Sequence, residues 1–134
     1  MMLRAVFLTL FAFAPIALWA NEEVKCNNGG NQSEMNACAS NDFAKADKEL
    51  NQAYQVLIKK EADDSLFISK LRLAQKAWIT FRDADLEARF ACLEDNVRIC
   101  WGSMYPMLFL YRKAELTRER TKHLQQILKD GRGE

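Results

Sequence analysis

The amino-acid sequence predicts an all-α fold, with three long helices in an antiparallel up-down-up bundle that is stabilised by disulfides at one end. Apolar residues recur at steps of three and four over three long segments, which is the spacing of amphipathic helices. Only 5 Gly and 2 Pro occur among the 134 residues, and no stretch of useful length alternates as a strand would. Long helices with short connections pack as a bundle.

Residues 1–20 have the pattern of a secretory signal peptide, which leaves residues 21–134 as a single helical domain with its core over about 26–128. Arg4 is the only charged residue before an uncharged run over residues 5–18. At about 14 residues this run is short of the roughly 20 that a membrane-spanning helix needs. We expect cleavage after Ala20. A lipid anchor would need Cys directly after the cut, whereas the nearest is Cys26, so we expect a periplasmic or secreted protein without an anchor.

The first predicted helix runs from about Asn31 to Lys60, after a loop that contains adjacent glycines. Asn31 and Glu34 have the spacing of a capping box, in which each side chain accepts a hydrogen bond from the backbone of the other residue. The apolar positions that predict its buried face are Met35, Ala39, Phe43, Ala46, Leu50, Tyr54 and Leu57.

The second predicted helix begins beside Asp63, Asp64 and Ser65, each of which suits the N-cap position. No Gly or Pro separates it from the first helix, so one kinked helix is the alternative. Its predicted buried face follows alternating steps of four and three, the repeat of a coiled coil. These positions are Phe67, Leu71, Ala74, Trp78, Phe81, Asp85, Ala88 and Cys92.

The third predicted helix begins near Ser103 to Pro106, because Pro fits the first turn of a helix. A frayed polar tail is expected over residues 130–134. The residues that predict the buried face of this helix are Leu110, Ala114, Thr117, Leu124 and Leu128.

Four cysteines in an exported chain predict two disulfides. Cys26, Cys38, Cys92 and Cys100 have 11, 53 and 7 residues between them, which does not match the CxxC spacing of a zinc site. The bundle topology brings all four to one end. We favour the local pairs, Cys26 with Cys38 and Cys92 with Cys100, while Cys38 with Cys92 and Cys26 with Cys100 remain open.

The composition and the motifs argue against nucleic-acid binding and against an enzyme. The 19 basic and 18 acidic side chains leave a net charge of +1. The chain therefore lacks the excess of basic side chains that nucleic-acid binding needs. The sequence lacks HExxH, a Walker-type loop and GxSxG, and its one His, His123, falls on a polar helix face. We therefore expect no catalytic residues, no cofactor and no metal.

An ordered set of residues is spread along the chain: Cys26, Ser33 to Ala39, Phe43, Ala46, Asp47, Leu50, Asn51, Tyr54, Gln75, Ala77, Trp78, Phe81 to Ala84, Gly102, Ser103, Pro106, Met107, Leu116, Thr117 and Arg120. This pattern resembles the lysozyme inhibitor LprI-like family of small bacterial envelope proteins. The resemblance covers about residues 26–124. It implies an all-helical periplasmic or secreted domain without a cofactor, and it implies inhibition of a lysozyme-type muramidase as the activity of the name-giving member. That family usually places Cys at the positions of Leu86 and Arg112.

Many of these residues have a structural interpretation as contacts between helices. The turn between the first two helices sets Asn51 level with Gln75, and Asp47 level with Trp78. The second hairpin sets Arg120 beside Trp78 for cation-π stacking.

In the same register, Arg82 lies beside Leu116 and Thr117. We also predict a partly shielded ion pair between Asp85 and Arg112.

The loop over residues 96–105 is the predicted partner-binding surface. Arg98, Trp101, Met104 and Tyr105 are residue types enriched at binding hot spots. Trp101 fits a second interpretation equally well, as a cap on the bundle core. The leading hypothesis is a binding module, with a lysozyme-type muramidase as its partner. The alternative is an envelope structural or stress protein that assembles through a helix face.

Overall fold

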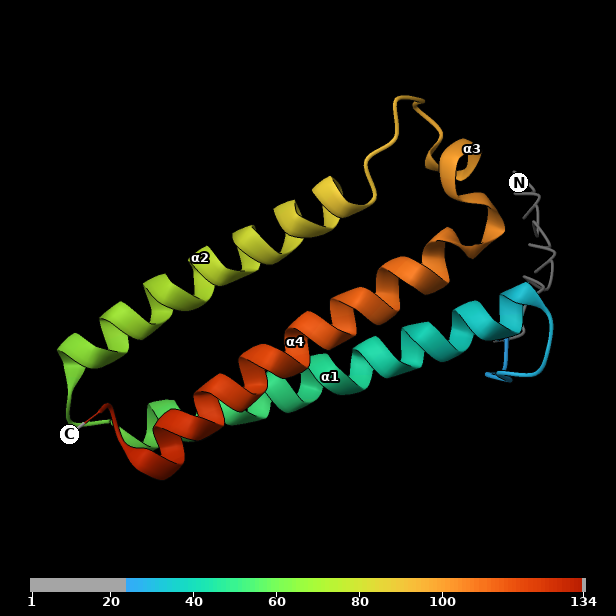
Figure 1. The fold of residues 1–134 in the computed structure, drawn as a ribbon. Coiled ribbons are helices and arrows are strands. Elements are labelled where there is room, and N and C mark those ends of the chain that lie inside the picture. Colours follow the sequence, from blue (N-terminus) through green and yellow to red (C-terminus); the bar gives the residue numbers. More distant parts are fainter. Residues whose placement is uncertain (1–23, 134) are drawn as a thin grey trace, which may run out of the picture.

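The computed structural model describes residues 24–133, and the predicted signal peptide lies outside these residues. Three long helices, α1 (Gln32–Lys60), α2 (Ser65–Arg89) and α4 (Tyr105–Asp130), run up, down and up (Figure 1). Between α2 and α4 lie the short helix α3 (Val97–Trp101) and the 3-10 turn η1 (Gly102–Met104). The predicted all-α bundle is therefore confirmed, and α3 with η1 is an element that the periodicity did not predict.

Side-chain caps fix the starts of α1 and α2. Asn31 Oδ1 accepts hydrogen bonds from the backbone N–H of Ser33 and Glu34 at 2.9 and 3.1 Å, and Glu34 Oε2 accepts from the Asn31 N–H at 2.8 Å. The predicted capping box is thus confirmed. At α2 the N-cap is Asp64, whose carboxylate accepts from the Phe67 N–H at 2.8 Å.

Helices α1 and α4 pack side by side and run parallel over most of their length (Figure 1). Small side chains allow this close approach: Ala39 and Ala46 of α1 and Ala114 of α4 are each 0% exposed. Leu57 and Leu124, also fully buried, fill the core where the pair meets α2.

Helix α2 lies farther from α1 than α4 does (Figure 1). It reaches the other two helices through longer side chains. Its inward residues are Phe67, Leu71, Gln75, Trp78, Arg82, Leu86 and Phe90. Beyond Leu71 the predicted face is right at Trp78, which packs against the core, but wrong at Ala74, Phe81 and Ala88, which are exposed. The predicted positions keep a strict seven-residue repeat, whereas a straight helix of 3.6 residues per turn drifts by about 20° per heptad.

Both disulfides lie at the end of the bundle where α1 and α4 begin and α2 ends, as predicted. Cys26 is bonded to Cys38 and Cys92 is bonded to Cys100, with Cα separations of 4.5 and 5.9 Å. The favoured local connectivity is confirmed, and the two long-range pairings are excluded.

The C-terminal tail is anchored rather than frayed. Arg132 Nη1 donates to Asp64 Oδ2 at 2.8 Å, and the guanidinium lies 4.7 Å from the centre of the Phe67 ring. Hydrogen bonds from the Phe67 N–H and from Arg132 lower the pKa of Asp64. The tail therefore ties the end of α4 to the turn between α1 and α2.

Candidate partner-binding end

An aromatic cluster centred on Phe90 holds the disulfide-bearing end together. Phe90 is only 7% exposed, and its ring lies 5.1 Å from Trp101, 5.8 Å from Tyr105 and 5.7 Å from Phe109. The contacts with Trp101 and Tyr105 are edge-to-face, at interplanar angles of 70° and 86°. Such geometry is favourable for aromatic pairs, so the cluster gives α3 and η1 a fixed position against α2 and α4.

Two of the predicted binding residues belong to this packing. Trp101 and Tyr105 are partly buried against the cluster formed by Phe90, Leu86 and Leu116. Trp101 Nε1 is buried and has no hydrogen-bond acceptor within residues 24–133. Of the two interpretations of Trp101, the structure favours the core cap.

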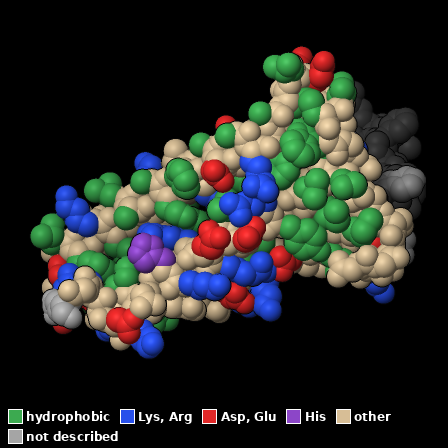
Figure 2. Space-filling model, viewed as in Figure 1, with side chains coloured by type: hydrophobic (Ala, Val, Ile, Leu, Met, Phe, Trp, Pro, Cys, Tyr) green, Lys and Arg blue, Asp and Glu red, His purple; other side chains and the backbone are tan. Residues whose placement is uncertain are grey.

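The outer surface of the same end exposes apolar side chains, which we call the tip: Leu93, Ile99 and Met104, with exposed fractions of 104%, 66% and 46%. Figure 2 shows hydrophobic side chains gathered over this end of the molecule. Arg98 and Met104, predicted from residue type, lie on it. Leu93 and Ile99 were missed, although a signal existed: both lie between Cys92 and Cys100, and a seven-residue disulfide loop is too short to bury its own apolar side chains.

The tip also carries charge. The loop closed by Cys92 and Cys100 contains two exposed carboxylates, Glu94 and Asp95, and one exposed cation, Arg98. The tip is thus locally acidic, although the whole chain carries a net charge of +1. An apolar centre beside exposed carboxylates is complementary to a basic protein surface.

A groove of about 490 Å³ adjoins the tip, between the end of α2 and the first turns of α4. Phe90, Trp101 and Leu108 contribute apolar atoms, and Arg89, Tyr111, Arg112 and Glu115 contribute polar ones. Arg112 donates to Glu115 at 2.7 Å, and this hydrogen bond raises the pKa of Arg112.

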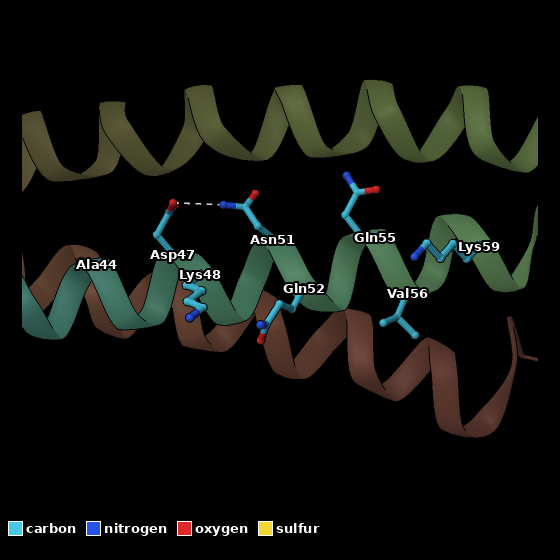
Figure 3. Close-up of a pocket in the computed structure, with 8 residues that line it drawn as sticks. All are labelled: Ala44, Asp47, Lys48, Asn51, Gln52, Gln55, Val56 and Lys59. Carbon is cyan, nitrogen blue, oxygen red and sulfur yellow. Dashed lines mark hydrogen bonds between the residues drawn. The ribbon is translucent and has the colours of Figure 1, made fainter.

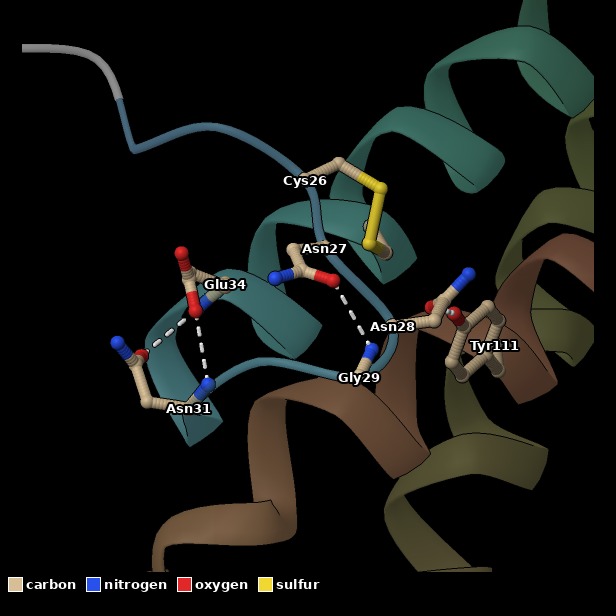
Figure 4. The surroundings of a disulfide bond; sticks show 8 residues. Cys26, Asn27, Asn28, Gly29, Asn31, Glu34 and Tyr111 are labelled. Atoms are coloured by element: carbon tan, nitrogen blue, oxygen red, sulfur yellow. Dashed lines mark hydrogen bonds between the residues drawn. A yellow bond between two sulfur atoms is a disulfide. The ribbon is translucent and has the colours of Figure 1, made fainter.

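The loop held by the other disulfide contacts the same end. Asn27 Oδ1 accepts from the Gly29 N–H at 3.1 Å, and the Tyr111 hydroxyl donates to Asn28 Oδ1 at 3.3 Å (Figure 4). The first disulfide therefore supports the start of α4, from which the tip projects.

The predicted contacts between α1 and α2 do not form. Asn51 donates instead to Asp47 of its own helix, at 3.0 Å. Both residues line a shallow depression of about 620 Å³ on α1, where Asp47, Asn51 and Gln55 point to the side on which α2 lies (Figure 3). The predicted register brought these side chains too close to α2, because α2 leans on α4 rather than on α1.

The contacts between α2 and α4 are displaced by two to three residues from the prediction. Arg120 Nε donates to Gln75 Oε1 at 3.0 Å, and the cation that stacks on Trp78 is Arg82, with its guanidinium carbon 5.1 Å from the ring centre. Burial lowers the pKa of Arg120. Thr117 is fully buried, and its hydroxyl donates to the Lys113 carbonyl at 2.7 Å.

The predicted pair of Asp85 with Arg112 was wrong. Arg112 is paired with Glu115, and Asp85 adds only a weaker electrostatic attraction. The acidic residue that joins α2 to α4 is Asp83, which lies 2.8 Å from Arg82 Nη2 and 3.5 Å from Lys113 Nζ. The hydrogen bond from Arg82 is the main cause that lowers the pKa of Asp83.

Within residues 24–133, no group of His, Cys, Asp and Glu is placed to hold a metal ion. None of the helices in that range is long and apolar enough to cross a bilayer.

The fold and its disulfides define a small all-helical domain of an oxidising, extracytoplasmic compartment. The model of the lysozyme inhibitor LprI family matches residues 25–124, and the chain belongs to this family. A similar relative is an uncharacterised protein of Rhizobium meliloti (strain 1021), 35% identical over 117 residues that cover 79% of this chain and 80% of the relative. No solved structure matches the chain significantly.

Proposed function

We propose that this protein is a periplasmic or secreted binding module that inhibits a lysozyme-type muramidase, and that the tip is its contact surface. Membership of a family named for lysozyme inhibition supports the partner. The single observation that supports the surface is the exposure of Leu93, Ile99 and Met104 on a loop clamped by a disulfide. A clamped loop loses little conformational entropy when it docks, so more of its contact energy remains as affinity.

In this proposal the tip blocks the muramidase by binding to it, without any chemical step. Leu93 has the largest exposed fraction of the three tip residues, and burying a leucine side chain in a partner contributes about 1.5–3 kcal/mol. Glu94 and Asp95 would accelerate the approach of a basic muramidase. The Phe90 cluster supports the tip from behind and takes no part in the contact.

The proposal is tested by titrating the purified, oxidised protein into a lysozyme assay on a bacterial cell-wall suspension. Leu93→Asp and Ile99→Asp should each weaken inhibition by about tenfold or more, because hot-spot losses exceed about 1.4 kcal/mol. Their melting temperatures should stay unchanged, since neither side chain packs in the core. Val56→Asp is the matched control, because Val56 is 53% exposed but lies on α1 far from the tip.

The variant Trp101→Ala tests whether Trp101 stabilises the fold rather than contacts the partner. We expect it to lower the free energy of unfolding by about 3 kcal/mol, since it removes a packed aromatic. If the wild-type protein neither binds nor inhibits any muramidase, the proposed partner is wrong. If Leu93→Asp inhibits as well as wild type does, the proposed surface is wrong.

Export through a cleaved signal peptide is part of the same proposal. Protein recovered from the extracytoplasmic fraction should begin at Asn21.

A further inference from the structure

Helix α2 has a second apolar face, which points away from the bundle. We call it the outer stripe: Leu66, Leu73, Ala77, Phe81, Ala84 and Ala88, at steps of seven, four and three residues, so that all lie on one side of the helix. Its large side chains are well exposed, at 68% for Leu66, 60% for Leu73 and 65% for Phe81. Figure 2 shows hydrophobic side chains at the surface along α2 as well as over the tip.

The outer stripe is symmetric about Ala77 except at one position, where Lys70 mirrors Ala84. Leu73 and Phe81 each lie four residues from Ala77, and Leu66 and Ala88 each lie eleven residues from it. Two such helices in antiparallel register, with the two-fold axis at Ala77, therefore set Leu73 opposite Phe81 and Leu66 opposite Ala88. The small central residue allows close approach, and a large side chain faces a small one at the ends. A surface complementary to itself is what a two-fold dimer requires.

The charges agree with this pairing. Lys70, exposed within the stripe, falls opposite Ala84 of the second copy, one helical turn from the exposed Glu87. The ammonium group can reach that carboxylate, and the symmetry repeats the pair at the other end. These opposite charges support the antiparallel arrangement.

We propose that this protein forms a two-fold dimer through the outer stripe of α2, with Ala77 at the axis. The stripe ends at Ala88, before Cys92, so both tips remain free at opposite ends of the dimer. The proposal is therefore independent of muramidase binding. A single helix pair about 33 Å long buries less than the roughly 1,200 Å² of a standard interface, so we expect dissociation in the micromolar range.

Sedimentation analysis of the purified, oxidised protein between about 5 and 500 µM tests the dimer, and the average mass should rise from monomer to dimer. Ala77→Glu sets two carboxylates against each other at the axis and should weaken association by more than about tenfold. Ile79→Glu is the matched control, because Ile79 lies outside the outer stripe and is 42% exposed. Both variants should keep wild-type helicity.

A charge exchange tests the register. Leu73→Glu alone and Phe81→Lys alone should weaken the dimer, while the double variant should restore it, because each Glu then faces a Lys of the other copy. A wild-type protein that remains monomeric over the whole range would overturn the proposal. A dimer that resists Ala77→Glu, or that Ile79→Glu weakens equally, would also overturn it. Muramidase inhibition by Ala77→Glu should equal that of wild type, so failure of the dimer and failure of the inhibitor role are distinguishable.

Discussion

The pair formed by α1 and α4 differs from α2 in how the helices make contact. Alanines that are 0% exposed let α1 and α4 approach closely along their length, whereas α2 reaches them through Trp78, Arg82 and Leu86. Close packing of small residues leaves one arrangement for α1 and α4. Helix α2 carries apolar residues on two sides, so one side packs in the bundle and the other is exposed. The tightly packed pair therefore determines the fold, and α2 is left with surface for contacts.

A large expected effect tests the close pair of α1 and α4. Ala46→Leu adds three carbon atoms between α1 and α4 at a fully buried position, so the helices must separate or the side chain must strain. We expect the free energy of unfolding to fall by about 2–3 kcal/mol, measured by urea denaturation. Ala44→Leu on the exposed side of α1 is the control, and it should change stability by less than about 0.5 kcal/mol. Equal effects at both positions would mean that α1 and α4 do not pack closely at Ala46.

An intermediate effect tests how α2 is held. Asp83→Ala leaves the buried guanidinium of Arg82 without its carboxylate, and Lys113 loses its partner on α2. Stranding a buried charge costs 3–5 kcal/mol in general, but Asp83 is 44% exposed, so we expect about 2 kcal/mol. Asp85→Ala is the control and should cost less than about 1 kcal/mol. A larger loss of stability for Asp85→Ala than for Asp83→Ala would instead support the register of α2 against α4 that the sequence predicted.

The ion pair of Asp83 with Arg82 also makes the stability of the protein depend on pH. Because the folded-state pKa of Asp83 lies below its ordinary value of 3.8, the pair stabilises the protein at pH values above 3.8. That contribution is lost as pH falls through the lowered pKa. Wild type should therefore lose more stability on acidification than Asp83→Ala does.

The sequence predicted the features that depend on neighbouring residues. Asn31 and Glu34 were sufficient to predict the start of α1, and short spacing favoured the two disulfides that form. The buried face of α2 was not predictable in the same way. The positions of the predicted seven-residue repeat are more apolar than the positions that are in fact buried. Arg82, 7% exposed, is the clearest case: a cation enters the core only because Trp78 and Asp83 lie beside it.

The candidate site shows the same division. Residue type selected four binding candidates, of which Arg98 and Met104 are exposed, whereas Trp101 and Tyr105 pack on Phe90. Whether an aromatic residue binds a partner or fills a core depends on neighbours that are distant in the sequence. Leu93 and Ile99 gain their exposure from the Cys92–Cys100 loop, which the sequence could have indicated once that pairing was known.

The smallest expected effect on stability is at Phe81, and it defines the difference between the two regions most sharply. Phenylalanine to alanine in a core costs about 3–5 kcal/mol, but Phe81 is 65% exposed and lies on the outer stripe, so we expect less than about 0.5 kcal/mol at concentrations where the protein is monomeric. Phe90→Ala is the matched control, because Phe90 is 7% exposed at the centre of the aromatic cluster and should show the full core cost. Urea denaturation at low protein concentration measures both. A large loss at Phe81 would mean that this side chain packs within one chain, in which case the heptad would be the true buried face of α2 and the outer stripe would not exist as a free surface.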